Sequence, residues 1–213
     1  MKSLRYVGFI LLLALALPLS WNALGYINFD FTYGFLKLKQ QAIATGWYLP
    51  DYYSHVLISG IILVAGIFQL HDGWRRRWPS IHKNLGKVYV FGILLFAAPG
   101  GFVMSFFIER GTLVFMSFVL QCLAWVVCTY LALSAIRNRD ITNHRNWMWR
   151  SYSITLAAIT LRVYVFLGSW SFDLGQPIAY ATIAWLSWVP NLLVCEAYIF
   201  LKSRVGIKTN LGS

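Results

Sequence analysis

Acidic side chains are scarce in this chain. Asp and Glu together number 7, against 18 Lys and Arg, and the formal net charge at pH 7 is +11. Inside the long apolar stretches described below, Glu196 is the only acidic residue. A conventional ion-coupled transporter needs several carboxylates within the membrane. The sequence therefore argues against that class of protein.

Motifs of familiar enzyme chemistry are missing as well. The chain has no GxSxG, no HExxH and no P-loop, so no catalytic residue is assigned. Its three cysteines, Cys122, Cys128 and Cys195, all fall in apolar stretches, where they cannot form an external disulfide framework. We interpret them as small apolar side chains and expect no metal site built on them.

Apolar sequence, in contrast, is abundant, because 59% of the residues are hydrophobic. A span of the bilayer core takes about 20 apolar residues. Six stretches are long enough: Tyr6–Gly25, Tyr53–Leu70, Lys87–Phe107, Thr112–Ala135, Ser151–Trp170 and Ile178–Leu201. With short connections between them, they predict one all-α transmembrane domain over residues 1–213, a six-helix bundle. No small-residue cleavage site follows the first run, so we expect that span to be retained.

The basic residues are distributed unevenly among the connections. With the N-terminus in the cytoplasm, 14 of the 18 Lys and Arg lie on the inner side, three on the outer side, and Arg162 within a span. The positive-inside rule then places both termini in the cytoplasm of a bacterial inner-membrane protein. Because the charges sit in short loops, they suit contact with anionic lipid headgroups, and we expect no binding of nucleic acid.

One group of polar residues is expected in the outer half of the membrane. At about 1.5 Å per residue, Arg162 lies about 18 Å and Asn191 about 15 Å from the inner ends of their spans. Pro99, in the segment Ala97–Gly101, predicts a kink at similar depth, and His55 lies near the outer end of span two. These residues could border one ligand pocket. For Arg162, snorkelling to the surface and pairing with backbone carbonyls remain alternatives.

A second polar layer is expected near the inner face. Glu196 has Arg150, His82 and His144 as candidate partners, and we expect His82, His144 and Glu196 to converge. The layer either fastens helix ends by an ion pair or binds a cofactor or handles protons. Its members are Gln69, His71, His82, His144, Trp147, Arg150 and Glu196.

Histidines on facing helices can ligate haem. His71, His82 and His144 are all on the inner side and only His55 is on the outer side, which argues against two haems stacked across the membrane. A single haem b held by His82 and His144 stays open. So do a metal ion bound together with Glu196, a quinone headgroup, and simple anchoring at the interface.

Three segments make the chain similar to a known family: IHKNLGKVYV around His82, HRNWMWRSYSITLAAITLRVY from His144, and IAWLSWVPNLL in span six. They resemble a bacterial family of predicted multi-pass membrane proteins that is defined only as a domain of unknown function. The resemblance covers about residues 51–200. It implies a multi-pass membrane fold and no particular mechanism.

Together these patterns predict a membrane protein that binds a small ligand or a cofactor such as haem b or quinone, with a link to redox chemistry. The alternative is a non-enzymatic transporter of a small hydrophobic or anionic compound, or an accessory subunit of a membrane complex. The lipid bilayer is the partner common to both readings.

Overall fold

A computed structural model describes residues 2–70, 72–171, 173 and 176–210, and all regular structure in these residues is helical. His71 lies outside the described residues. Six helical segments are long and apolar enough to cross a membrane: Tyr6–Asn28, Tyr48–Leu70, Pro79–Ser105, Thr112–Arg137, Ile141–Trp170 and Ile178–Arg204. The prediction of an all-α protein with six spans is confirmed.

The first two spans are joined by the longest connection. Helix α1 (Lys2–Leu24) is followed by three short helices, and α3 forms the second span. The bounds are η1 (Gly25–Asn28), η2 (Gly34–Leu38), α2 (Gln40–Ala44) and α3 (Tyr48–Leu70).

Three of the remaining four spans are built from shorter consecutive helices, and the fourth span is the single helix α7. Their bounds are α4 (Asp72–Arg77), α5 (Pro79–Gly92), η3 (Ile93–Ala97), α6 (Ala98–Ser105), α7 (Thr112–Arg137), α8 (Ile141–Thr155), α9 (Ala157–Ser171), α10 (Pro177–Leu186) and α11 (Val189–Asn210).

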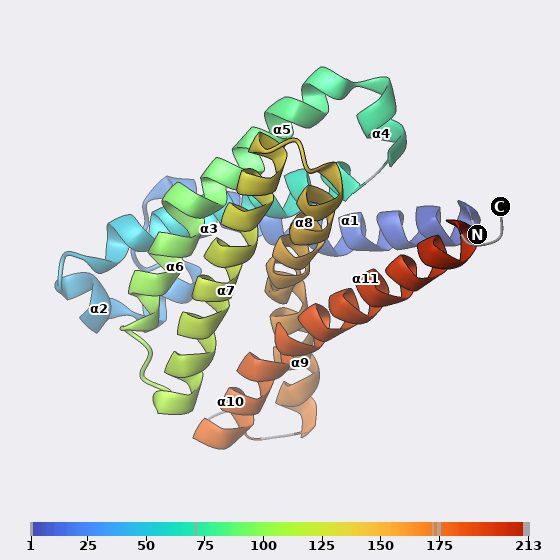
Figure 1. The fold of residues 1–213 in the computed structure, drawn as a ribbon. Helices are drawn as coiled ribbons and strands as arrows, with labels where there is room; N and C mark the ends of the chain where they lie inside the picture. The colour runs from blue at the N-terminus through green and yellow to red at the C-terminus, as the bar shows by residue number, and fades with distance from the viewer. Residues whose placement is uncertain (1, 71, 172, 174–175, 211–213) are drawn as a thin grey trace.

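The ends of the spans gather at two ends of the bundle (Figure 1). The start of α1, the end of α3, α4, the start of α5 and the end of α11 lie at one end. The connection containing α2, the α6–α7 turn and the start of α10 lie at the opposite end. Because the number of spans is even, the start of α1 and the end of α11 lie at the same end of the bundle. We call it the terminal end.

The second span begins at Tyr48 instead of Tyr53, and two later spans begin earlier still, relative to the apolar sequence. The third span starts at Pro79 instead of Lys87, and the fifth at Ile141 instead of Ser151. Pro79 occupies the first position of α5, which suits its fixed φ and missing N–H. Asp140 caps α8 by accepting a hydrogen bond from the Asn143 N–H at 3.0 Å, and this contact holds the pKa of Asp140 below its usual range. A proline at the first position of α5 and a polar cap at α8 therefore let both helices begin before the apolar core, and His82 and His144 are helical.

The irregularity predicted around Pro99 takes the form of a π-helical turn, η3, directly before it. Proline cannot donate to the carbonyl one turn back and clashes with it. The backbone accommodates this by widening over Ile93–Ala97 before α6 continues.

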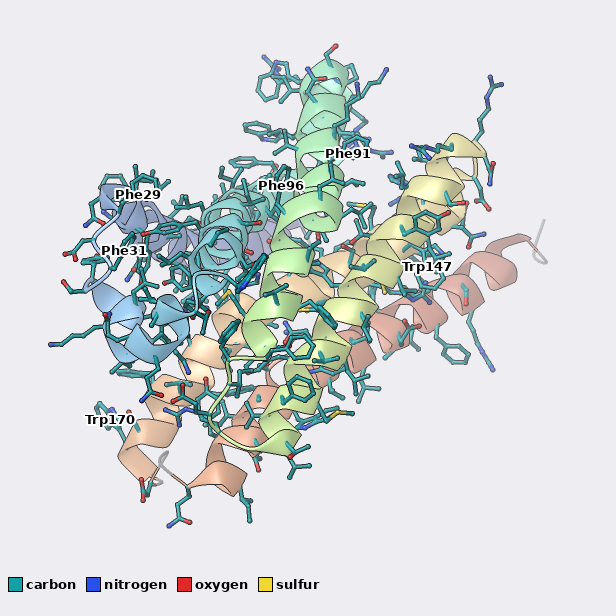
Figure 2. All side chains as sticks on the ribbon, turned by 90° about the vertical axis from the view of Figure 1, so that its left-hand side faces the viewer. Phe29, Phe31, Phe91, Phe96, Trp147 and Trp170 are labelled. Atoms are coloured by element: carbon teal, nitrogen blue, oxygen red, sulfur yellow. The ribbon has the colours of Figure 1, made fainter. Side chains whose placement is uncertain are left out.

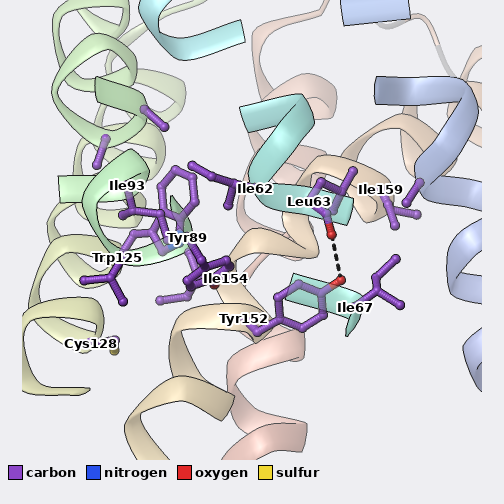
Figure 3. Close-up of a cluster of buried hydrophobic side chains, with 14 residues drawn as sticks. Ile62, Leu63, Ile67, Tyr89, Ile93, Trp125, Cys128, Tyr152, Ile154 and Ile159 are labelled. Carbon is purple, nitrogen blue, oxygen red and sulfur yellow. Dashed lines mark hydrogen bonds between the residues drawn. The ribbon is translucent and has the colours of Figure 1, made fainter. Parts of the chain in front are cut away.

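The centre of the bundle combines apolar side chains with hydroxyl groups (Figure 3). The Tyr89 hydroxyl lies 2.8 Å from the Thr155 hydroxyl and 3.1 Å from that of Ser151. The Tyr152 hydroxyl donates to the Leu63 carbonyl at 3.2 Å. Such bonds between spans replace partners that lipid cannot offer, so this network joins α5, α8 and α3.

The outside of the bundle is largely apolar (Figure 2). Phe91, Phe96 and Trp170 are exposed, as are many aliphatic residues of all six spans. A water-soluble monomer does not expose apolar surface around its whole circumference. The surface is that of a protein solvated by lipid.

Candidate functional site

A cleft of about 900 Å³ opens at the terminal end of the bundle, between α1, α3, α4, α5, α7, α8 and α11. It contains both His82 and His144, and we call it the histidine cleft. Its volume falls in the range of about 300–1,000 Å³ that is usual for small-molecule sites. The cleft brings together three residues predicted for the inner site: Gln69, His82 and His144.

His144 is oriented by the neighbouring span. Its Nδ1 atom lies 2.8 Å from the backbone carbonyl oxygen of Ala132 on α7. A carbonyl only accepts, so Nδ1 carries a proton, and the neutral form of the ring then has its lone pair on Nε2. Nε2 has no partner among the described residues. An imidazole fixed in this way is prepared to accept a hydrogen bond or to ligate a metal.

His82 lies on the opposite helix α5, within electrostatic reach of His144. Its backbone carbonyl accepts a hydrogen bond at 3.0 Å from the side-chain amide of Gln69 on α3. This bond fastens α3 to the start of α5 and uses the amide nitrogen of Gln69. The Gln69 carbonyl oxygen faces Gly86, where there is space for an ordinary contact.

The rim of the cleft is cationic and its interior mostly apolar. The cationic side chains are Arg75, Arg76, Arg145 and Lys202. The apolar ones include Phe9, Leu12, Ile67, Leu70 and Met148. A molecule with a polar head and an apolar body fits this division, with its head at the terminal end and its body against α1 and α3.

Arg150 and Glu196 do not line the cleft. The guanidinium of Arg150 binds the Glu196 carboxylate through two hydrogen bonds, of 2.5 and 2.8 Å, and stacks on Trp147 with 4.4 Å between its Cζ and the ring centroid. Arg150 was one of the expected partners of Glu196. The expected convergence of Glu196 with His82 and His144 is wrong, because the ion pair holds its carboxylate between α8 and α11.

A metal site built from Glu196, His82 and His144 is not supported either, because the Glu196 carboxylate is paired with Arg150. Within the described part of the chain, no three His, Cys, Asp or Glu side chains come together in a group able to hold a metal ion. The three cysteines are buried and free.

The residues predicted for an outer site are divided between two places. His55 is attached to the π turn, because its Nδ1 donates to the Ala97 carbonyl at 2.6 Å and Ser54 donates to the Phe96 carbonyl at 3.0 Å. Asn191 instead donates to the Ser187 carbonyl at 2.9 Å and to Thr160 at 3.2 Å. Pro99 itself has no N–H to donate. It follows the π turn whose Ala97 and Phe96 carbonyls accept the bonds from His55 and Ser54.

Arg162 joins neither group by a hydrogen bond in the described residues. Its Nη1 donates to the Ala158 carbonyl, one turn back on α9, at 2.8 Å. Of the alternatives considered for Arg162, this is pairing with a backbone carbonyl. It lies within electrostatic reach of His55, and in the described residues no hydrogen bond joins it to Asn191.

Sequence reasoning missed the hydroxyl network beside the cleft. Thr129 lies 2.8 Å from Ser151, and the Trp125 indole donates to Thr155 at 3.1 Å. Trp125 and Thr129, like Ser151 and Thr155, are four residues apart and so share a helix face. That spacing of polar groups within two apolar spans was the available signal.

Comparison with known proteins adds the family and nothing more specific. No curated protein and no solved structure matches the chain. A family model described as "Predicted membrane protein (DUF2306)" matches residues 52–199, which include the segments around His82 and His144. The protein therefore belongs to the DUF2306 family of predicted multi-pass membrane proteins, whose function is unknown.

Proposed function

We propose that this protein binds one small amphipathic redox cofactor, of the quinone class, in the histidine cleft. The observation that carries the proposal is the position of His82 and His144 in one cleft of about 900 Å³. Ligand sites combine an apolar lining with a few placed polar groups in this way.

The tautomer of His144 defines what the cleft recognises. Because Nδ1 donates to Ala132, Nε2 of the neutral ring accepts a hydrogen bond. The hydroxyl of a reduced quinone supplies such a donor. His82, on the opposite wall, contacts the second polar end of the same ring, and the cationic rim favours partial negative charge on the ring oxygens.

The apolar tail of such a cofactor has a defined place. Tyr6, Phe9 and Leu12 bring α1 to the cleft, and α1 also exposes apolar residues such as Val7 and Leu11 on the outside of the bundle. A tail that lies along α1 passes from the cleft into the lipid without leaving an apolar environment.

A single haem b is the second candidate for the same cleft. The fixed Nδ1 of His144 is its supporting observation, since histidines that bind iron through Nε2 usually donate Nδ1–H to a carbonyl or carboxylate. His82 would then be the second axial ligand.

The orientation of the protein in the membrane follows from the distribution of its basic residues. We infer that the terminal end faces the cytoplasm of a bacterial inner membrane, because 14 of the 18 basic residues fall on that side. The cleft then opens to the inner leaflet.

The test is an absorption spectrum and a lipid extract of the detergent-purified protein, expressed with ample haem supply. Quinone in the extract of the wild type, but not of His82→Ala or His144→Ala, supports the proposal. A Soret band in the wild type that both variants lose would identify the cofactor as haem instead of quinone. A colourless protein without quinone overturns both in favour of a transporter or an accessory subunit.

A further inference from the structure

Gln69 and His144 both line the histidine cleft, and each is oriented by one hydrogen bond to a backbone carbonyl. The Gln69 Nε2 donates to the His82 carbonyl at 3.0 Å, and the His144 Nδ1 lies 2.8 Å from the Ala132 carbonyl. Because a carbonyl only accepts, the amide nitrogen and the protonated ring nitrogen must face it. These two bonds therefore decide which atom of each side chain is left for a ligand.

The two atoms that remain are both hydrogen-bond acceptors. They are the Oε1 of Gln69 and, in the neutral ring, the Nε2 of His144. Neither has a hydrogen-bond partner in the described part of the chain. The unpartnered side-chain atoms that are buried there belong to Tyr53, Ser59 and Gln121, so the two acceptors are not sealed inside the protein. A molecule in the cleft can reach both.

Gly86 on α5 leaves the space beside the Gln69 oxygen open. A Cβ added at Gly86 would lie 3.6 Å from Oε1, so an alanine there would cover one side of the oxygen. The backbone does not call for glycine at this position, because Gly86 lies within a helix and its φ is not positive. Glycine weakens a helix relative to alanine, and access to the Gln69 oxygen accounts for its presence.

The two tyrosines that line the cleft, Tyr89 and Tyr152, have no hydrogen left to give a ligand. The Tyr152 hydroxyl donates to the Leu63 carbonyl at 3.2 Å. The Tyr89 hydroxyl lies 2.8 Å from that of Thr155, which itself donates to the Ser151 carbonyl at 3.0 Å. The hydrogen between Tyr89 and Thr155 therefore comes from Tyr89, and its single O–H is used.

We propose that the histidine cleft selects the reduced form of its ligand, and that Gln69 determines this selection together with His144. The inference rests on the proposed function, the binding of a quinone-class cofactor in this cleft. A quinol has two hydroxyl groups, one donor for each of the two acceptors. A quinone has two carbonyl oxygens, which only accept, so the Gln69 oxygen and the His144 Nε2 would stay unpaired. A site built to bond a hydroxyl rejects a ligand without it for this reason.

Selection of the quinol changes the reduction potential of the bound couple. The quinone takes up two electrons and two protons to become the quinol, so tighter binding of the quinol favours reduction. For a two-electron couple, each tenfold preference for the reduced form raises the potential by about 30 mV. The bound couple should therefore have a higher potential than the same couple free in detergent.

Equilibrium binding to the detergent-purified protein tests the selection, under anaerobic conditions at about pH 8, where an ordinary imidazole is neutral. The probes are a short-chain benzoquinol and the benzoquinone formed by its oxidation. In the wild type the quinol should bind at least about tenfold more tightly, a difference of about 1.4 kcal/mol. Gln69→Met should lower this ratio at least about threefold, because the quinol loses one acceptor. Gln41→Met, at an exposed position of α2, should keep the wild-type ratio.

The ratio of the two affinities separates selection from a merely structural role of Gln69. Loss of the bond to His82 alone would weaken quinol and quinone equally, and that result in Gln69→Met overturns the proposal. Gln69→Glu keeps an acceptor oxygen but cannot donate to His82, so it should retain the preference for quinol, and loss of the preference there also counts against the proposal. This second variant decides if Gln69→Met does not fold.

The wild-type measurement also distinguishes this inference from the proposed function. Equal affinity for quinol and quinone overturns the selection and leaves the quinone site standing. Binding of neither form overturns both.

Discussion

The guanidinium of Arg150 on α8 and the carboxylate of Glu196 on α11 form a two-point ion pair, with Nε–Oε1 at 2.5 Å and Nη2–Oε2 at 2.8 Å. The pair connects the fifth and sixth spans beside, and not within, the histidine cleft. Arg150 and Glu196 therefore hold the two spans together, whereas His82 and His144 line the cleft and are available to a ligand.

Loss of this pair should affect stability without affecting the cleft. Glu196→Ala should lower the free energy of unfolding by about 1 kcal/mol, because the carboxylate is half-exposed and such pairs contribute modestly. Unfolding in mixed detergent measures it. The cofactor bound per protein should be unchanged, and loss of cofactor in a folded Glu196→Ala protein would put Glu196 back into the site.

Gly66 is required by the close approach of two tyrosine rings. A Cβ at this position would overlap the Tyr152 ring and lie 3.0 Å from that of Tyr89. Gly66→Ala should therefore destabilise the bundle by about 1–3 kcal/mol. Gly8→Ala, which meets nothing within 4 Å, is the control and should be neutral or slightly stabilising. Equal stability of both variants would contradict the packing around Tyr152.

The hydroxyl of Tyr89 should contribute measurably to the stability of the bundle. Tyr89→Phe removes the bonds to Ser151 and Thr155, and we expect a loss of about 1 kcal/mol, as for other interhelical hydrogen bonds in membranes. Tyr130→Phe, at an exposed position of α7, controls for removal of a hydroxyl. The measurement is the free energy of unfolding of both variants. A loss of equal size in Tyr89→Phe and Tyr130→Phe would show that the hydroxyl network does not stabilise the bundle.

Topology can be tested with single cysteines, because the native cysteines are buried. Ser80 and Glu109 are exposed and lie at opposite ends of the third span. A membrane-impermeant maleimide should label Glu109→Cys in intact cells and Ser80→Cys only after the cells are opened. Labelling of Ser80→Cys in intact cells would reverse the orientation and place the histidine cleft on the outer side.

The sequence predicts the spans well because length and apolarity decide them. The starts of α5 and α8 were misplaced because Pro79 and Asp140 extend helices through polar sequence, where hydropathy carries no signal. The signal for these helix starts lies in the residues that begin or cap a helix, such as Pro79 and Asp140.

The candidate site was harder to predict, since depth along a helix does not give direction around it. His82 and His144 share both depth and a cleft. Glu196 has the same depth, but the nearby Arg150 takes its carboxylate. Asn191 and Arg162 likewise share a depth, yet Asn191 bonds to Ser187 and Thr160.

The central claim is that His144 presents Nε2 to a cofactor in the histidine cleft. Its most direct test is the affinity of the purified protein for a short-chain quinol, measured by equilibrium binding in detergent. We predict saturable binding of one molecule, weakened about tenfold or more in His144→Ala, a loss of about 1.4 kcal/mol, and unchanged in Glu196→Gln. Equal affinity of wild type and His144→Ala, with both proteins folded, would contradict the account.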